Sequence, residues 1–166
     1  MITPNRKNVN LSRLPKDLMA DLYERIILRW ELDVKVSENG FDIRDKQLKA
    51  FLSDNKIYLQ AYDNQTEYSS NQDITLKEEV NDYLYFVNIE SSQPKSILRH
   101  LRNAVAHAHV QKVKNQLLLN AFNIKKQEVM RGKLKQKIFI SFVDALVTSS
   151  RPKKSKIALN DEAQAM

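Results

Sequence analysis

The sequence predicts a mainly α-helical fold, a bundle of four to five helices with a small β-hairpin near the C-terminus. The chain of 166 residues has only two glycines and four prolines, the residues that most disfavour helix interiors. Apolar residues recur at helical spacing in four segments. Beyond Val110 the pattern changes to alternation, which is typical of strands. With 42% hydrophobic residues, a chain of this length can bury a core as one domain over residues 1–149.

The first two predicted helices cover residues 15–34 and 45–62. Pro15 suits the first turn of the first helix, and the pair Asn39-Gly40 ends it. The second helix is weak around Ser53, so a break is expected to be tolerated there. The inner faces of the two helices are formed by Leu18, Leu22, Ile26 and Trp30, and by Leu48, Phe51, Leu52, Tyr58 and Leu59.

A polar segment without periodicity, residues 63–73, predicts a loop. A third helix follows over residues 76–87. The fourth begins at Pro94 and ends near His107 or His109. Their inward residues are Leu76, Val80, Tyr83, Leu84 and Val87, and Ile97, Leu101, Ala104, Val105 and Ala108.

Alternating residues over 117–138 predict a two-stranded hairpin around a polar turn, with a basic face on its second strand. A short helix over 141–149 closes the domain. The remaining residues, 150–166, are basic and then acidic, and we expect them to be disordered.

The net charge of +7 is distributed unevenly. Residues 1–90 hold 12 Lys and Arg against 16 Asp and Glu, whereas residues 91–156 hold 15 against two. This asymmetry favours a polyanionic partner, nucleic acid first and an anionic membrane surface second. A solvated basic face kept for solubility is the alternative.

Other functions are disfavoured by what the sequence lacks. Without cysteine there is no disulfide, thiolate metal site or thiol nucleophile. No HExxH motif occurs, so we expect no metal and no cofactor. The N-terminus lacks the apolar stretch of a signal peptide, and no aliphatic run is long enough to span a membrane. We therefore expect a cytoplasmic protein without membrane association.

All three histidines lie in one short segment, residues 99–109, with the sequence RHLRNAVAHAH. His100 and His107 are two helical turns apart, which is too far for both imidazoles to bind one metal ion. Arg102 and Asn103 precede His107 with three residues between Asn103 and the histidine. This is an Arg-polar-x3-His motif.

This segment resembles the Rx4–6H motif of the HEPN superfamily, many of whose members are metal-independent endoribonucleases of toxin–antitoxin and antiviral defence systems. The resemblance implies an HEPN-like helical bundle over roughly residues 10–149, although only residues 99–109 carry motif residues. It implies catalytic roles for Arg102, Asn103 and His107. His109 fits the motif at a longer spacing, and His100 and Arg99 are further candidates for catalysis or substrate contact.

The resemblance also implies a homodimer with the motif at its two-fold interface, and an antitoxin or defence protein as a partner. On a straight helix Arg102 and His107 point about 140° apart. Either the helix distorts before His107, or a second copy of the helix completes the site. The small side chains of Ala104, Ala106 and Ala108 favour close approach of two helices.

RNA supplies its own nucleophile, the 2′-hydroxyl, so cleavage to a 2′,3′-cyclic phosphate and a 5′-hydroxyl needs only proton transfer and charge stabilisation. Histidine suits the first task and arginine the second. Two alternatives stay open: a catalytically inactive HEPN-fold module that binds RNA or a protein, and an unrelated basic helical protein that binds DNA. The residues expected to hold the RNA backbone are Lys125, Lys126, Arg131, Lys133, Lys135 and Lys137.

Overall fold

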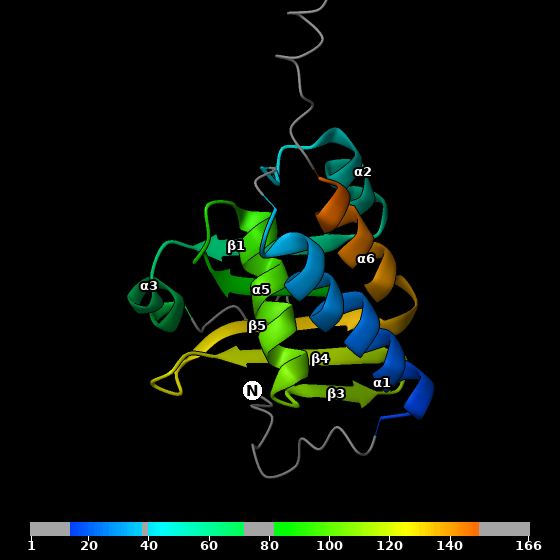
Figure 1. The fold of residues 1–166 in the computed structure, drawn as a ribbon. Coiled ribbons are helices and arrows are strands. Elements are labelled where there is room, and N and C mark those ends of the chain that lie inside the picture. Colours follow the sequence, from blue (N-terminus) through cyan, green and yellow to red (C-terminus); the bar gives the residue numbers. More distant parts are fainter. Residues whose placement is uncertain (1–13, 38–39, 72–81, 150–166) are drawn as a thin grey trace, which may run out of the picture.

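The protein has an α/β fold built on a five-stranded mixed sheet. The computed structural model describes residues 14–37, 40–71 and 82–149. The strand order is β1-β2-β5-β4-β3, with β1 and β2 parallel and every other pair antiparallel. Figure 1 shows helices α1, α5 and α6 together on one face of this sheet. The prediction of a mainly α, HEPN-like helical bundle is therefore wrong.

The first predicted helix is confirmed in extent, but most of it has π-helical hydrogen bonding. It consists of α1 (Lys16–Leu22), η2 (Tyr23–Leu28) and η3 (Trp30–Val34). The backbone N–H of Lys35 donates to the carbonyl of Trp30 at 2.9 Å, five residues back. The buried residues recur strictly every fourth position, a period longer than the 3.6 residues of an α-helix. Wider π-helical turns keep such a row on one face. The row is Leu18, Leu22, Ile26, Trp30 and Val34.

The second predicted helix is wrong in its second half. Helix α2 covers Lys46–Asp54, and the side chain of Asp45 caps it by accepting from the N–H of Leu48 at 2.8 Å. The chain then turns through Lys56, which has a positive φ of 53°, and continues as strand β1 (Ile57–Tyr62). The weak region around Ser53 is thus the boundary between a helix and a strand.

Two further assignments over residues 63–87 are wrong. The expected loop contains helix α3 (Gln65–Ser70), capped by Asn64, whose side chain accepts from the N–H of Glu67 at 2.9 Å. The described part of the expected third helix is strand β2 (Asp82–Val87), while residues 76–81 lie outside the described residues. Every residue of β2 is buried, and a strand buried on both faces lacks the alternation that distinguishes strands from helices.

The remaining elements follow the predictions more closely. The fourth helix is confirmed as α5 (Gln93–Ala106), with Pro94 in its first turn. The hairpin is confirmed as β4 (Gln116–Phe122) and β5 (Glu128–Lys135). The prediction did not include a further strand, β3 (Val110–Val113), which pairs with β4. The closing helix is longer than predicted: α6 covers Gln136–Thr148, so Lys137 lies in a helix and not on the basic strand.

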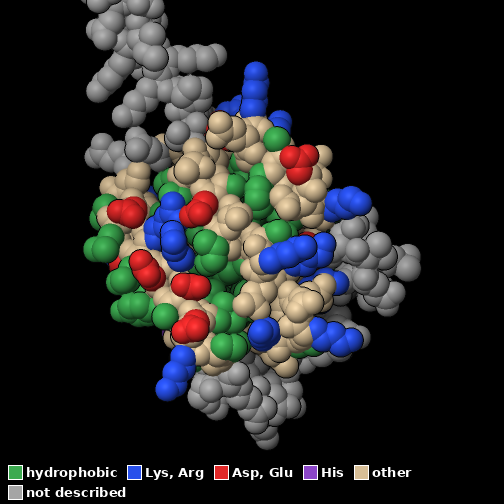
Figure 2. Space-filling view, turned by 90° about the vertical axis from the view of Figure 1, so that its right-hand side faces the viewer, with side chains coloured by type: hydrophobic (Ala, Val, Ile, Leu, Met, Phe, Trp, Pro, Cys, Tyr) green, Lys and Arg blue, Asp and Glu red, His purple; other side chains and the backbone are tan. Residues whose placement is uncertain are grey.

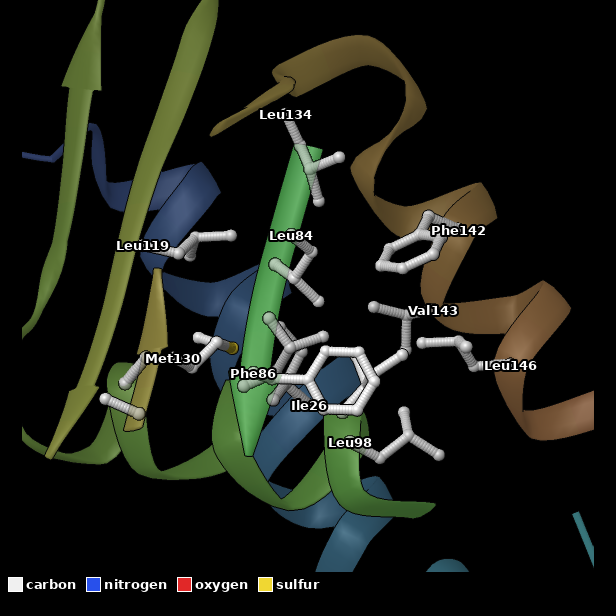
Figure 3. Close-up of a cluster of buried hydrophobic side chains, with 14 of the residues drawn as sticks. Ile26, Leu84, Phe86, Leu98, Leu119, Met130, Leu134, Phe142, Val143 and Leu146 are labelled. Atoms are coloured by element: carbon white, nitrogen blue, oxygen red, sulfur yellow. The ribbon is translucent and has the colours of Figure 1, made fainter. Parts of the chain in front are cut away.

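The core lies between the sheet and the helices. In Figure 3 the side chains of Leu84 and Phe86 from β2 point toward Phe142, Val143 and Leu146 of α6. All five are less than 1% exposed. Gly132 of β5 pairs with Leu84 in the sheet, and a Cβ at Gly132 would lie 2.3 Å from Leu84 Cδ1. This glycine therefore makes room for a core leucine.

The expected disordered tail, residues 150–166, and residues 1–13 lie outside the described residues. Among the described helices, none has the length and apolar character needed to cross a membrane.

Candidate active site at the end of helix α5

The predicted motif lies at the C-terminal end of α5, where the chain reverses in a Schellman turn. His107 is the C-cap residue. Ala108 follows with a φ of 60°, and its N–H donates to the carbonyl of Val105 at 3.2 Å. The N–H of His109 donates back to the carbonyl of Ala104 at 2.8 Å. This pair of hydrogen bonds is the standard way to end a helix with a left-handed residue.

The turn brings His107 and His109 together. Their ring centroids are 6.3 Å apart. The side chain of His107 is exposed and His109 is half-buried, with its ring edge-on to Phe122 of β4 at 4.9 Å. The carbonyl of His109 accepts from the N–H of Asn120 at 3.1 Å. The two imidazoles are thus fixed to both the end of α5 and the sheet.

Arg102 and Asn103 form a second pair, one helical turn earlier. Arg102 donates from one terminal nitrogen to Glu31 of η3 at 3.0 Å and from the other to the Oδ1 of Asn103 at 3.2 Å. The pKa of Glu31 lies below its usual value, first because Lys35 donates a hydrogen bond to it, and also because Arg102 does so. The guanidinium, 31% exposed in its side chain, is held in place at the surface.

The structure does not bring Arg102 and His107 into contact. Helix α5 stays regular to its end, because the N–H of His107 donates to the carbonyl of Asn103 at 3.0 Å, four residues back. The alternative in which the helix distorts before His107 is therefore wrong. The three alanines do not form one surface on which a second helix could pack closely. Ala104 is fully buried and Ala108 lies beyond the end of the helix, so only Ala106 is exposed on α5.

Two further candidates in the motif have other partners. His100 is 1% exposed and its Nε2 lies 2.7 Å from the carbonyl of Val87, so in this fold the ring packs in the interior and not at the surface. Burial lowers the pKa of His100 to about 4, which keeps the ring neutral. Arg99 is half-exposed and forms an ion pair with Glu90 at 2.8 Å.

The predicted basic residues do not form one face. Arg131 is largely buried and donates to Glu128 at 2.9 Å, where Tyr68 and Asn120 also donate. This Glu128 network belongs to the packing of α3 against the sheet, and burial next to Glu128 raises the pKa of Tyr68.

The lysines are distributed over three places. Lys133 of β5 lies 5.7 Å from the ring centroid of Tyr83. Lys125 and Lys126 occupy the turn between β4 and β5, where Lys126 has a φ of 61°. Lys135 and Lys137 lie where β5 ends and α6 begins, and both are exposed.

Figure 2 views the side of the molecule on which β3 and β5 end. Most Asp and Glu side chains gather in the half of this view nearer the helices, and the other half carries mainly Lys and Arg. On this side of the molecule, positive charge thus lies mainly in the half away from the helices.

Sequence reasoning missed Glu31 and Phe122, which contact the motif residues from distant segments. No signal in the sequence links Glu31 to Arg102 across 71 positions. In the described part of the chain, no group of three His, Asp or Glu side chains is placed to hold a metal ion.

Comparison with protein-family models, with curated proteins and with solved structures finds no match to this chain. The resemblance of residues 99–109 to the HEPN motif therefore stays a prediction that rests on the sequence of that segment.

Proposed function

We propose that this protein is a metal-independent endoribonuclease in which His107 and His109 transfer protons. The observation that carries the proposal is the pair of imidazoles at the end of α5, 6.3 Å apart, with His107 exposed and His109 half-buried. Histidine exchanges protons near neutral pH, and two such groups at this separation suit a reaction that needs one base and one acid. The positive charge of the C-terminal half supports RNA as the substrate.

In the proposed reaction one imidazole removes the proton of the ribose 2′-hydroxyl. The 2′-oxygen forms a bond to the adjacent phosphorus, and the bond from phosphorus to the 5′-oxygen breaks. The second imidazole, in its protonated form, gives its proton to the departing 5′-oxygen. The products are a 2′,3′-cyclic phosphate and a 5′-hydroxyl, without a metal ion or a covalent intermediate.

Arg102 has a less direct role in this proposal than the motif implies. Glu31 and Asn103 occupy its two terminal nitrogens, so the guanidinium meets a phosphate only when one of them is released or when a free N–H of the same fork is used. We assign Asn103 to orienting Arg102. A second copy of the chain stays part of the proposal, because α5 by itself directs Arg102 and His107 apart.

The test is cleavage of a labelled RNA in EDTA, compared among single variants. His107→Ala and His109→Ala are each expected to lower the rate by about 10²–10⁴-fold, with a 2′,3′-cyclic phosphate among the wild-type products. The rate of cleavage is also measured in Arg102→Ala. Its matched control is Arg44→Ala, because Arg44 also lies in a surface ion pair, with Asp42. Cleavage that needs a divalent ion, or that persists in both histidine variants, contradicts the proposal.

A binding module without catalysis is the second candidate. The ion pair of Arg102 with Glu31 favours this second candidate. Because the carboxylate of Glu31 balances the charge of the guanidinium, Arg102 is suited to holding η3 against α5. This candidate predicts RNA or protein binding with no cleavage, and loss of thermal stability in both Arg102→Ala and Glu31→Ala.

The dimer, and an antitoxin or defence protein as a further partner, belong to the same proposal. Light scattering is expected to give twice the chain mass of 19.4 kDa. A monomer that cleaves RNA would remove the second copy from the mechanism but leave the roles of the histidines intact.

A further inference from the structure

A basic hollow lies at the other end of β3 from the two histidines. It has a volume of about 770 Å³ and is lined by Lys114, Asn115, Gln116, Lys135, Gln136 and Lys137. Lys114 and Asn115 form the turn between β3 and β4, Gln116 begins β4, and the last three residues come from the junction of β5 and α6. Pairing of Gln116 with Lys135 across the sheet brings the two segments together.

Within the described part of the chain, the lysine side chains of this hollow form no ion pair. All three are exposed. Asp82, next to Lys135 in the fold, is buried and accepts instead from the backbone N–H of Lys135 at 3.2 Å.

The start of α6 adds to this positive potential. No side chain caps the helix, and its first turn contains no acidic residue. Helix N-termini favour negative charge, so lysines at positions 135 and 137 are electrostatically unfavourable for the helix. Residues that oppose local stability in this way are typical of sites kept for binding.

We propose that this Lys114–Lys135–Lys137 pocket binds a phosphate of the RNA backbone away from the scissile bond. The inference rests on the proposed ribonuclease function and adds a second contact site to it. Lys114 lies five positions after His109, which places the backbones of the two residues about 16 Å apart at the rise of an extended strand. An RNA strand lying along β3 would reach both. Amide side chains in the lining add neutral hydrogen bonds to the sugar and phosphate.

Binding is measured by fluorescence anisotropy with a labelled oligonucleotide of about twelve residues, carrying 2′-deoxyribose so that it is not cleaved. The double variant Lys135→Glu/Lys137→Glu is expected to weaken binding about tenfold and to reduce the slope of log Kd against log salt by about 1. The matched control is Lys46→Glu/Lys49→Glu on α2, which changes the net charge equally at two exposed lysines. Equal weakening by both variants, or by neither, would overturn the proposal.

Competition separates the RNA backbone from a small phosphorylated ligand as the occupant. Inorganic tripolyphosphate is expected to displace the oligonucleotide only at concentrations far above the Kd of the oligonucleotide. Displacement at equal concentration would assign the pocket to a small polyphosphate and overturn the assignment to RNA.

A cleavage experiment distinguishes failure of the pocket from failure of the active site. A dinucleoside monophosphate has a single phosphate, which must occupy the catalytic site, so Lys135→Glu/Lys137→Glu is expected to lower its rate of cleavage much less than that of a longer RNA. Cleavage of the longer RNA should fall about tenfold at low concentration. Lack of all cleavage by the wild type contradicts the ribonuclease function, while the binding result still decides the pocket. Equal loss with both substrates would contradict the pocket as a separate site.

Discussion

At the residue scale, His100 links the stability of the fold to pH. Its ring is buried against Phe86, and its Nδ1 has no hydrogen-bond partner. Because a carbonyl oxygen only accepts, Nε2 carries the proton and donates to the carbonyl of Val87 at 2.7 Å. Burial lowers the pKa to about 4 from the usual 6.5. Below pH 6.5 the unfolded chain takes up a proton at this position before the folded chain does.

The sign of the effect follows from this difference. Because the unfolded state binds more protons between pH 6.5 and 4, stability is complete above pH 6.5 and is lost as the pH falls toward 4. The expected loss is up to about 3 kcal/mol. Urea unfolding at pH 7 and pH 4 measures it, with His100→Gln as the reference, because glutamine donates to Val87 but does not titrate there. An equal pH dependence in the two proteins would contradict the assignment.

Ala108 is an unfavourable residue for the turn that ends α5. Its φ of 60° lies in the left-handed region, which costs a residue with a Cβ about 1–2 kcal/mol and glycine little. Ala108→Gly is expected to stabilise the fold by about 1 kcal/mol in thermal or urea unfolding. The control is Ala50→Gly on the exposed face of α2, which should destabilise by about the same amount. A loss of stability in Ala108→Gly would argue against the Schellman turn.

At the scale of elements, the closest packing in the sheet is between β5 and β2. A Cβ at Gly132 would meet both Leu84 Cδ1 at 2.3 Å and the carbonyl of Tyr83 at 3.2 Å. Gly132→Ala is therefore expected to destabilise the protein by about 1–3 kcal/mol. Combining it with Leu84→Val should cost less than the sum of the two single changes. Additive effects in this double-mutant cycle would contradict the contact.

The elements that the sequence predicted correctly are those with strong local signals. Helix α5 has a cap, an early proline and a continuous apolar stripe, and the β4–β5 hairpin has clear alternation around a polar turn. Strands β1 and β2 were misassigned because their apolar residues also fit helical spacing. What decides their state is pairing with each other and with β5, which a short apolar run does not encode by itself.

Only the part of the candidate site that has a local sequence pattern was predicted. The segment with Arg102, Asn103, His107 and His109 could be found from its local pattern. The turn that brings the two imidazoles together depends on Ala108 adopting a left-handed conformation. Glycine is the residue that usually predicts this conformation at the end of a helix, and alanine does not. The contact of Arg102 with Glu31 depends on how η3 packs against α5, and no local pattern predicts it.

At the scale of the whole molecule, the distribution of charge opposes stability at the start of α6. Lys135 precedes the helix and Lys137 lies in its first turn. Changing both to glutamate places negative charge at the helix N-terminus, which is worth about 0.3–1 kcal/mol for each residue. The double variant is therefore expected to melt at a higher temperature than the wild type at low salt, although the proposed RNA binding would be weaker in it. A lower melting temperature would contradict this electrostatic account.

Strand β3 has four residues, lies at the edge of the sheet, and follows directly after the two histidines. Edge strands open more readily than central ones. When β3 detaches from β4, the hydrogen bond from Asn120 to the carbonyl of His109 breaks, and only the turn at the end of α5 still holds the backbone of His109. The amide proton of Asn120 therefore reports, through its exchange with solvent deuterium, the fraction of time for which the sheet holds the backbone of His109.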